Sequence, residues 1–190
     1  MNTIFFSQGL EHVLDINGYD HVLFLIALVA VYIYTDWKKV LAIVTSFTIG
    51  HTISLALAAY NVVGFNSGVI EFLIPVTIFL TAGYNLINNT KTNHKQWILL
   101  LSALAFGIIH GFGFSSYFQV IIGNESSKLW PLIQFALGIE VSQLIVVSVV
   151  LILAWFVQSF FKVSKRYWAI VLSAMVLGAV IPMIIESDIW

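Results

Sequence analysis

The segment LWPLIQFALGIEVSQLIVVSVVLILAWFV, residues 129–157, decides the fold class of this chain. Its only charged residue is Glu140, and it exceeds the roughly 20 apolar residues that an α-helix needs to cross the hydrocarbon of a bilayer. We expect this helix to tilt in the bilayer or to project from it, because it is too long for one straight crossing. The segment therefore predicts a membrane protein built from α-helices.

The composition of the whole chain agrees with this prediction. Of its 190 residues, 60% are hydrophobic and 9% are charged. Ordinary globular chains have roughly 45–50% apolar and about 25% charged residues. Eight Lys and Arg with nine Asp and Glu are too few to cover the surface of a water-soluble protein of this length. The length suits one domain, which we place over residues 1–190.

Charge and cysteine content exclude several classes of function. The net charge of −1 provides no basic field, so we expect no nucleic-acid partner. The chain has no cysteine, which excludes disulfides, iron–sulfur clusters and thiolate zinc sites. It also lacks the phosphate-binding GxxxxGK[ST] loop of a nucleotide-driven pump. The oligomeric state stays open at this level.

Apolar segments of spanning length recur along the chain, at residues 18–34, 40–62, 68–87, 97–118, 129–157 and 167–185. They predict an all-α bundle of six transmembrane helices between about residues 18 and 186. Residues 1–17 precede it, and within them 3–14 has an apolar stripe at helical spacing. We expect this N-terminal segment to form a helix that lies at the membrane interface.

The distribution of basic residues predicts the orientation of the bundle. Seven of the eight Lys and Arg lie in the connections at 35–39, 88–96 and 158–166, and the eighth is Lys128. Loops rich in Lys and Arg stay on the cytoplasmic side of a membrane. We therefore expect both termini to lie outside, in an integral protein of a bacterial inner (cytoplasmic) membrane.

Ionisable residues occur within or beside these apolar segments, where they are costly and usually functional. With the predicted topology, all of them fall in the outer half of the bundle: His12, Asp20, His21, His51, Glu71, His110 and Glu140. Imidazoles and carboxylates without thiolates suit Ni, Co, Zn or Fe(II) better than Cu(I), Mg or Ca. The set predicts a site for a divalent transition metal ion, with Ni, Co or Zn as candidates.

Some of these residues have a second interpretation. Asp20 and Glu71 lie near the start of their segments, where a carboxylate also stabilises a helix N-terminus. Asn85 and Gln143 are either hydrogen-bond partners that orient the metal ligands or polar links between helices. The glycines in FGIIHGFGF, 106–114, either allow close helix packing or weaken the helix so that it opens beside His110.

Five blocks of the sequence resemble the HupE/UreJ family of small membrane proteins, specifically its second subgroup. They are GLEHVLDINGYDHVLFLIAL (9–28), FTIGHTISL (47–55), VIEFLIPVTIFLTAGYN (69–85), FGIIHGFGFSS (106–116) and ALGIEVSQL (136–144). The resemblance implies a nickel or cobalt permease of the hydrogenase or urease accessory type. It places Asp20, His21, His51, His110 and Glu140 at motif positions, with Glu71 and Asn85 also matching. His12 is further from Asp20 than in the family's motif, and Ala136 replaces a common Asn.

Two functions follow from these observations, and we favour the first. In a secondary permease or facilitator, Asp20, His21 and His12 would capture the ion, and His51, His110 and Glu140 would bind it deeper. The alternative is an intramembrane zinc or iron enzyme, a hydrolase acting on a lipid or membrane-associated substrate, with Glu140 or Asp20 as general base. A haem site with His51 and His110 as axial ligands leaves the carboxylates without a role.

Overall fold

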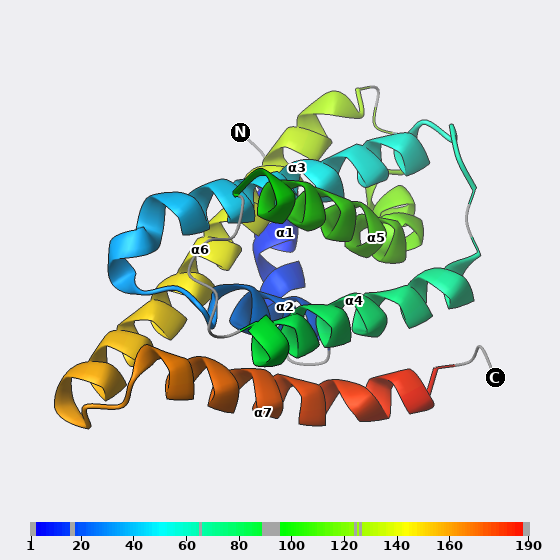
Figure 1. The fold of residues 1–190 in the computed structure, drawn as a ribbon. Coiled ribbons are helices and arrows are strands. Elements are labelled where there is room, and N and C mark those ends of the chain that lie inside the picture. The colour runs from blue at the N-terminus through cyan, green and yellow to red at the C-terminus, as the bar shows by residue number, and fades with distance from the viewer. Residues whose placement is uncertain are drawn as a thin grey trace.

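The computed structural model describes residues 3–15, 18–64, 66–88, 96–123, 125 and 127–187. All regular structure in these residues is helical, and none of them forms a strand. The elements are α1 (Ile4–Leu14), α2 (Asp20–Val29), a short 3₁₀ helix η1 (Tyr34–Asp36), α3 (Trp37–Ala59), α4 (Ser67–Asn88), α5 (Gln96–Ile122), α6 (Leu129–Phe160) and α7 (Lys165–Ile185) (Figure 1). The predicted all-α fold class is confirmed.

Five helices, α3 to α7, are long and apolar enough to cross a membrane. They coincide with the last five predicted spans. The longest, α6, is one unbroken helix of 32 residues, or about 48 Å at 1.5 Å per residue. It is therefore longer than the hydrocarbon core of about 30 Å, as the sequence predicts.

The segment predicted as the first span, 18–34, forms a shorter helix than expected. Helix α2 has ten residues and is about 15 Å long, which is half the thickness of the hydrocarbon. The chain leaves the helix after Val29, and Ile33 is extended. The backbone N–H of Ile33 donates to the carboxylate of Asp36 (3.4 Å), which fixes the turn into α3. Hydropathy counts the apolar residues 30–34 as part of the helix, and so it overestimates the length of α2.

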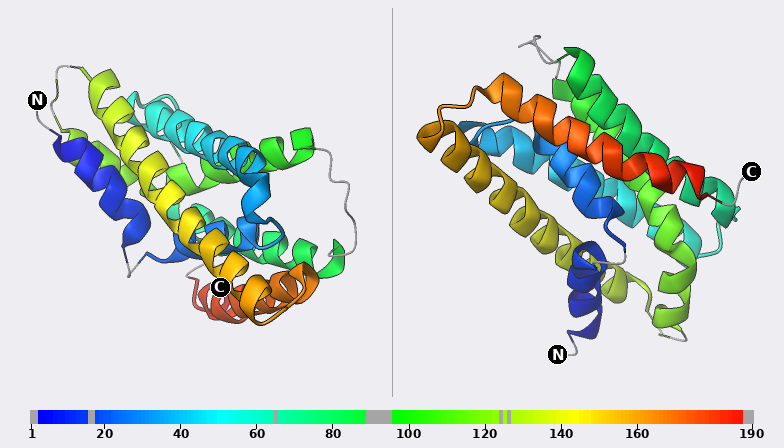
Figure 2. Two further views of the ribbon diagram at one scale, coloured as in Figure 1. Left: turned by 90° about the vertical axis from the view of Figure 1, so that its left-hand side faces the viewer. Right: turned by 90° about the horizontal axis from the view of Figure 1, so that it is seen from below.

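Helices pack in close pairs, with α1 along α6, α3 along α5 and α4 along α7 (Figure 2). Glycines lie in the contacts of α3 with α5 and of α1 with α6. A Cβ atom at Gly107 of α5 would collide with the carbonyl oxygen of Phe47 on α3, and one at Gly9 of α1 would collide with that of Phe135 on α6. Helix α5 is continuous through Gly107 and Gly111, so these glycines serve close packing and no opening is present.

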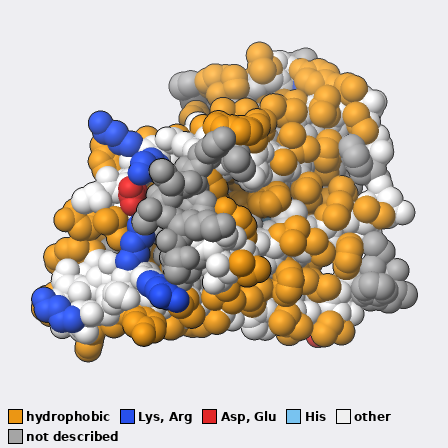
Figure 3. Space-filling view, in the orientation of Figure 1, with side chains coloured by type: hydrophobic (Ala, Val, Ile, Leu, Met, Phe, Trp, Pro, Cys, Tyr) orange, Lys and Arg blue, Asp and Glu red, His pale blue; other side chains and the backbone are white. Residues whose placement is uncertain are grey.

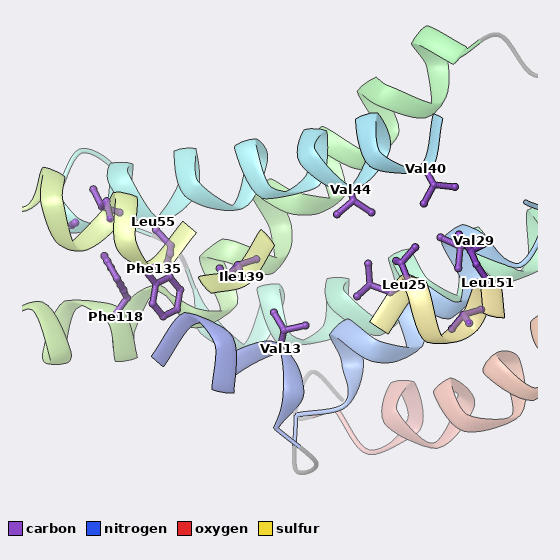
Figure 4. Packing of buried hydrophobic residues seen from close by; sticks show 14 of the residues in the cluster. Val13, Leu25, Val29, Val40, Val44, Leu55, Phe118, Phe135, Ile139 and Leu151 are labelled. Carbon is purple, nitrogen blue, oxygen red and sulfur yellow. The ribbon is translucent and has the colours of Figure 1, made fainter. Parts of the chain in front are cut away.

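An apolar core runs along α6 and connects it to α1, α2, α3 and α5 (Figure 4). Val13 of α1 is fully buried in it. The helix expected over residues 3–14 is thus present, and it is held against the bundle. The labelled core side chains are Val13, Leu25, Val29, Val40, Val44, Leu55, Phe118, Phe135, Ile139 and Leu151.

The face in Figure 3 is mostly hydrophobic, and basic side chains gather at one end of it. Lys39 and Lys165 contact the carboxylate of Asp36 at 3.1 and 3.8 Å. This links the start of α3 to the start of α7. The basic segments before α3 and before α7 therefore lie at the same end of the bundle, as expected for two connections on one side of a membrane.

The close contact between α3 and α5 makes a prediction about stability. Gly107→Val should destabilise the fold by about 1–3 kcal/mol or more, because the added atoms overpack a backbone contact. Gly178→Val on α7 is the matched control, since a Cβ atom there meets nothing within 4 Å. Thermal unfolding in detergent measures the difference. Equal melting temperatures for the two variants would contradict the packing described.

Candidate metal centre

Four histidines from four different helices meet inside the bundle. They are His12 of α1, His21 of α2, His51 of α3 and His110 of α5. Ring centroids are 4.6 Å apart for His12 and His21, 5.6 Å for His12 and His51, 5.7 Å for His21 and His51, and 5.2 Å for His21 and His110. One ligand atom from each of His12, His21 and His51 lies within 4.8 Å of the others. We call these four residues the histidine cluster.

Three rings of the histidine cluster are buried and His12 is half-buried, and the cluster is rich in unsatisfied nitrogens. The exposed fractions of His21, His51 and His110 are 3%, 0% and 1%. Among the described residues, no hydrogen-bond partner reaches Nε2 of any of the four rings or Nδ1 of His51. Each buried polar atom without a partner costs about 1–3 kcal/mol. A shared cation would satisfy several of these nitrogens at once, because a neutral imidazole nitrogen is a metal ligand.

Two of the rings are held by polar partners. Nδ1 of His110 donates to the backbone oxygen of Phe106 at 2.9 Å, since a carbonyl can only accept. Nδ1 of His21 lies 3.1 Å from the carboxylate of Asp20, which also accepts the backbone N–H of His21 at 2.8 Å. Both contacts place the proton on Nδ1 and leave the Nε2 lone pair available. This is the usual arrangement around metal-bound histidine.

Aromatic rings enclose the histidine cluster. Phe114 packs on His12 with a centroid distance of 3.8 Å. Phe24 and Phe47, both fully buried, lie 5.3 and 5.2 Å from His110 and 5.0 Å from each other. The sequence analysis did not assign a role to these phenylalanines. The four-residue spacing of Phe47 to His51, which Phe106 and His110 repeat, is the signal that points to one of them.

Glu140 lies in a different environment from the histidines. Its Oε1 accepts a hydrogen bond from Thr45 at 2.6 Å, and its Oε2 contacts the hydroxyl of Thr48. Thr48 also lies 3.0 Å from Oε1 of Gln143. The structure therefore brings Glu140 and Gln143 to two threonines of α3. Neither is hydrogen-bonded to a histidine of the cluster.

The remaining candidates, Glu71 and Asn85, are not hydrogen-bonded to the histidine cluster either. Glu71 is exposed on α4, whose first turn is capped by Asn66, the acceptor of N–H groups from Gly68 and Val69. Asn85 donates to the backbone oxygen of Ala27 at 2.6 Å and so connects α4 to α2. In this structure, the groups that orient the histidines are Asp20 and the Phe106 carbonyl.

The family model of the HupE / UreJ protein matches residues 2–186. The chain belongs to the HupE/UreJ family. No curated protein and no solved structure matches it significantly. The resemblance seen in the five sequence blocks is thus confirmed over almost the whole chain.

Within this HupE/UreJ family chain, the matched region contains all four histidines of the cluster and every helix of the bundle. The family is linked to metal handling in membranes. A buried cluster of imidazoles between helices of spanning length is consistent with that link.

The histidine cluster predicts metal binding that depends on each ring. His51→Ala or His110→Ala should weaken binding of Ni²⁺ or Co²⁺ by more than the roughly 10–100-fold that loss of an orienting partner causes. Asp20→Asn should fall within that range, because Asp20 acts through His21. Isothermal titration of purified protein measures the affinities, with His94→Ala, outside the described residues, as control. Unchanged affinity in both the His51 and His110 variants would eliminate the site.

Proposed function

We propose that this protein is a secondary permease or facilitator for a divalent transition metal ion, nickel or cobalt in the first place, and that the histidine cluster is its ion-binding site. The observation that carries the proposal is the set of buried Nε2 atoms without partners on four separate helices. Nitrogen ligands of this kind prefer Ni, Co and Zn to Mg, Ca and Mn. Membership of the HupE/UreJ family supports nickel or cobalt among these.

The proposed topology has six crossings, with both termini outside. Helix α2 is short, so the first crossing would be completed by residues 30–36, which lead into α3. His21 lies in the first turn of α2, and His51 lies past the middle of α3. With the basic connections inside, the histidine cluster belongs to the outer half of the bundle. An ion would then reach it from the outer side.

A cavity of about 540 Å³ supports a route from the histidine cluster toward the inner side. It lies between α2, α3, α4 and α5 and is lined in part by Tyr32, Asn85 and Phe106. Phe106 connects the histidine cluster with this cavity: its carbonyl accepts the hydrogen bond from His110, and the same residue lines the cavity. The ring of Phe24 packs 5.7 Å from that of Phe106 and 5.3 Å from that of His110. Movement of these two phenylalanines would connect the site with the cavity.

Nothing in the described part of the chain favours the enzyme alternative. Its general base was expected to be Glu140 or Asp20. Glu140 accepts hydrogen bonds from Thr45 and Thr48 and from no histidine of the cluster. Asp20 is engaged by both the ring and the backbone of His21. The proposed permease does not require Glu140 or Asp20 to act as a general base at the bound ion.

Metal flux into proteoliposomes tests the proposal. Ni²⁺, Co²⁺, Zn²⁺ and Mn²⁺ are supplied separately to wild type, to His110→Ala and to the control Glu186→Gln, an exposed carboxylate at the end of α7. We expect saturable uptake of Ni²⁺ or Co²⁺ by wild type and the control, little Mn²⁺ uptake, and none through His110→Ala. No flux through wild type, with about one ion retained per chain, would refute a permease.

A further inference from the structure

Helices α3 and α6 form a second polar site beside the histidine cluster. Thr45 and Thr48 lie three residues apart on α3, and Glu140 and Gln143 lie three residues apart on α6. Each of the two helices therefore presents two side chains, about one turn apart, to the other helix. We call these four residues the oxygen cage. Thr48 is three residues before His51, so the oxygen cage lies about one helical turn from the histidine cluster.

Thr48 has more hydrogen-bond acceptors within reach than it has protons to donate. The hydroxyl of Thr48 carries a single proton, but it lies near three acceptor oxygens: Oε2 of Glu140, Oε1 of Gln143 at 3.0 Å and the backbone oxygen of Val44 at 3.3 Å. Gln143 is fully buried and directs its amide oxygen at Thr48, while its Nε2 has no partner among the described residues. The surplus of acceptors around Thr48 indicates a place for a cation.

The charge of Glu140 also indicates that a cation binds here. A carboxylate within a membrane-spanning helix is costly unless a positive charge lies close to it. The described ion pairs involve Asp20 and Asp36, and no basic side chain pairs with Glu140. One carboxylate is neutralised by one monovalent cation, whereas a divalent ion would leave a buried net positive charge.

The donor set distinguishes this site from the histidine cluster. Carboxylate, hydroxyl and amide oxygens are ligands of hard cations, while the imidazoles one turn away suit transition metals. The four side chains of the oxygen cage offer five oxygens, and a single proton would bridge only two of them. Glu140 is half-buried, so its carboxylate is partly accessible from the surface of the bundle.

We propose that Thr45, Thr48, Glu140 and Gln143 form a Na⁺-binding site, separate from the transition-metal site. Bound Na⁺ would tie α3 to α6 directly beside His51. If the proposed function holds, the site would couple a sodium gradient to metal transport. This coupling rests on the proposed permease, whereas Na⁺ binding itself does not.

Thermal unfolding of purified protein in detergent, at constant pH and ionic strength, tests the binding. NaCl is titrated against choline chloride for wild type, Glu140→Gln, Thr48→Val and the control Glu186→Gln. We expect a saturable rise of a few degrees in the Tm of wild type and the control, and a strongly reduced rise in the other two variants. Thr48→Ser should restore the rise, because it keeps the hydroxyl.

Radioactive ²²Na⁺ binding supplies the stoichiometry, with about one ion per chain expected for wild type. Ni²⁺ affinity is measured in parallel and should survive in Glu140→Gln and Thr48→Val, which also shows that these variants are folded. The proposal is overturned if Na⁺ and choline act alike on wild type, or if stability responds to pH alone, which would make Glu140 a proton site. Loss of Ni²⁺ binding in Glu140→Gln would also overturn it, because Glu140 would then belong to the histidine cluster.

Discussion

Contact between helix backbones is the constraint on which the rest of this structure depends. Gly9 lies three residues before His12 and faces the backbone of Phe135, and Gly107 lies three residues before His110 and faces the backbone of Phe47. Each glycine removes the side chain that would hold two helices apart, so rings from different helices approach to within 4.6–5.7 Å. Without these contacts the four histidines would be separate polar side chains in an apolar bundle.

The fold also explains why two kinds of polar site occur side by side. Helix α3 supplies His51 to one site and Thr45 and Thr48 to the other, so a single turn of helix separates nitrogen from oxygen ligands. The partners differ because α5 approaches α3 through glycine and brings a histidine, while α6 brings Glu140 and Gln143. Displacement of α3 relative to α6 would therefore affect both sites.

Hydropathy and residue type predict much of this arrangement. They fail where contacts between distant residues determine the end of a helix or the partner of a side chain. The spans over α3 to α7 follow from unbroken apolar segments, and His21, His51 and His110 follow from the cost of burying polar groups in lipid. The length of α2 does not, because the helix ends at Val29 although the apolar segment continues to the turn at Ile33 and Asp36. Glu140 resembles a metal ligand in the sequence, and only the pairing of α3 with α6 reveals its threonine partners.

The central claim is that imidazoles from separate helices bind one ion, and X-ray absorption spectroscopy of the zinc-loaded protein tests it most directly. Zinc bound by imidazole has Zn–N distances of about 2.0–2.1 Å. We predict a first shell of three or four such nitrogens, with the outer-shell scattering of imidazole rings, at one ion per chain. A shell made only of oxygen, without ring scattering, would contradict the account.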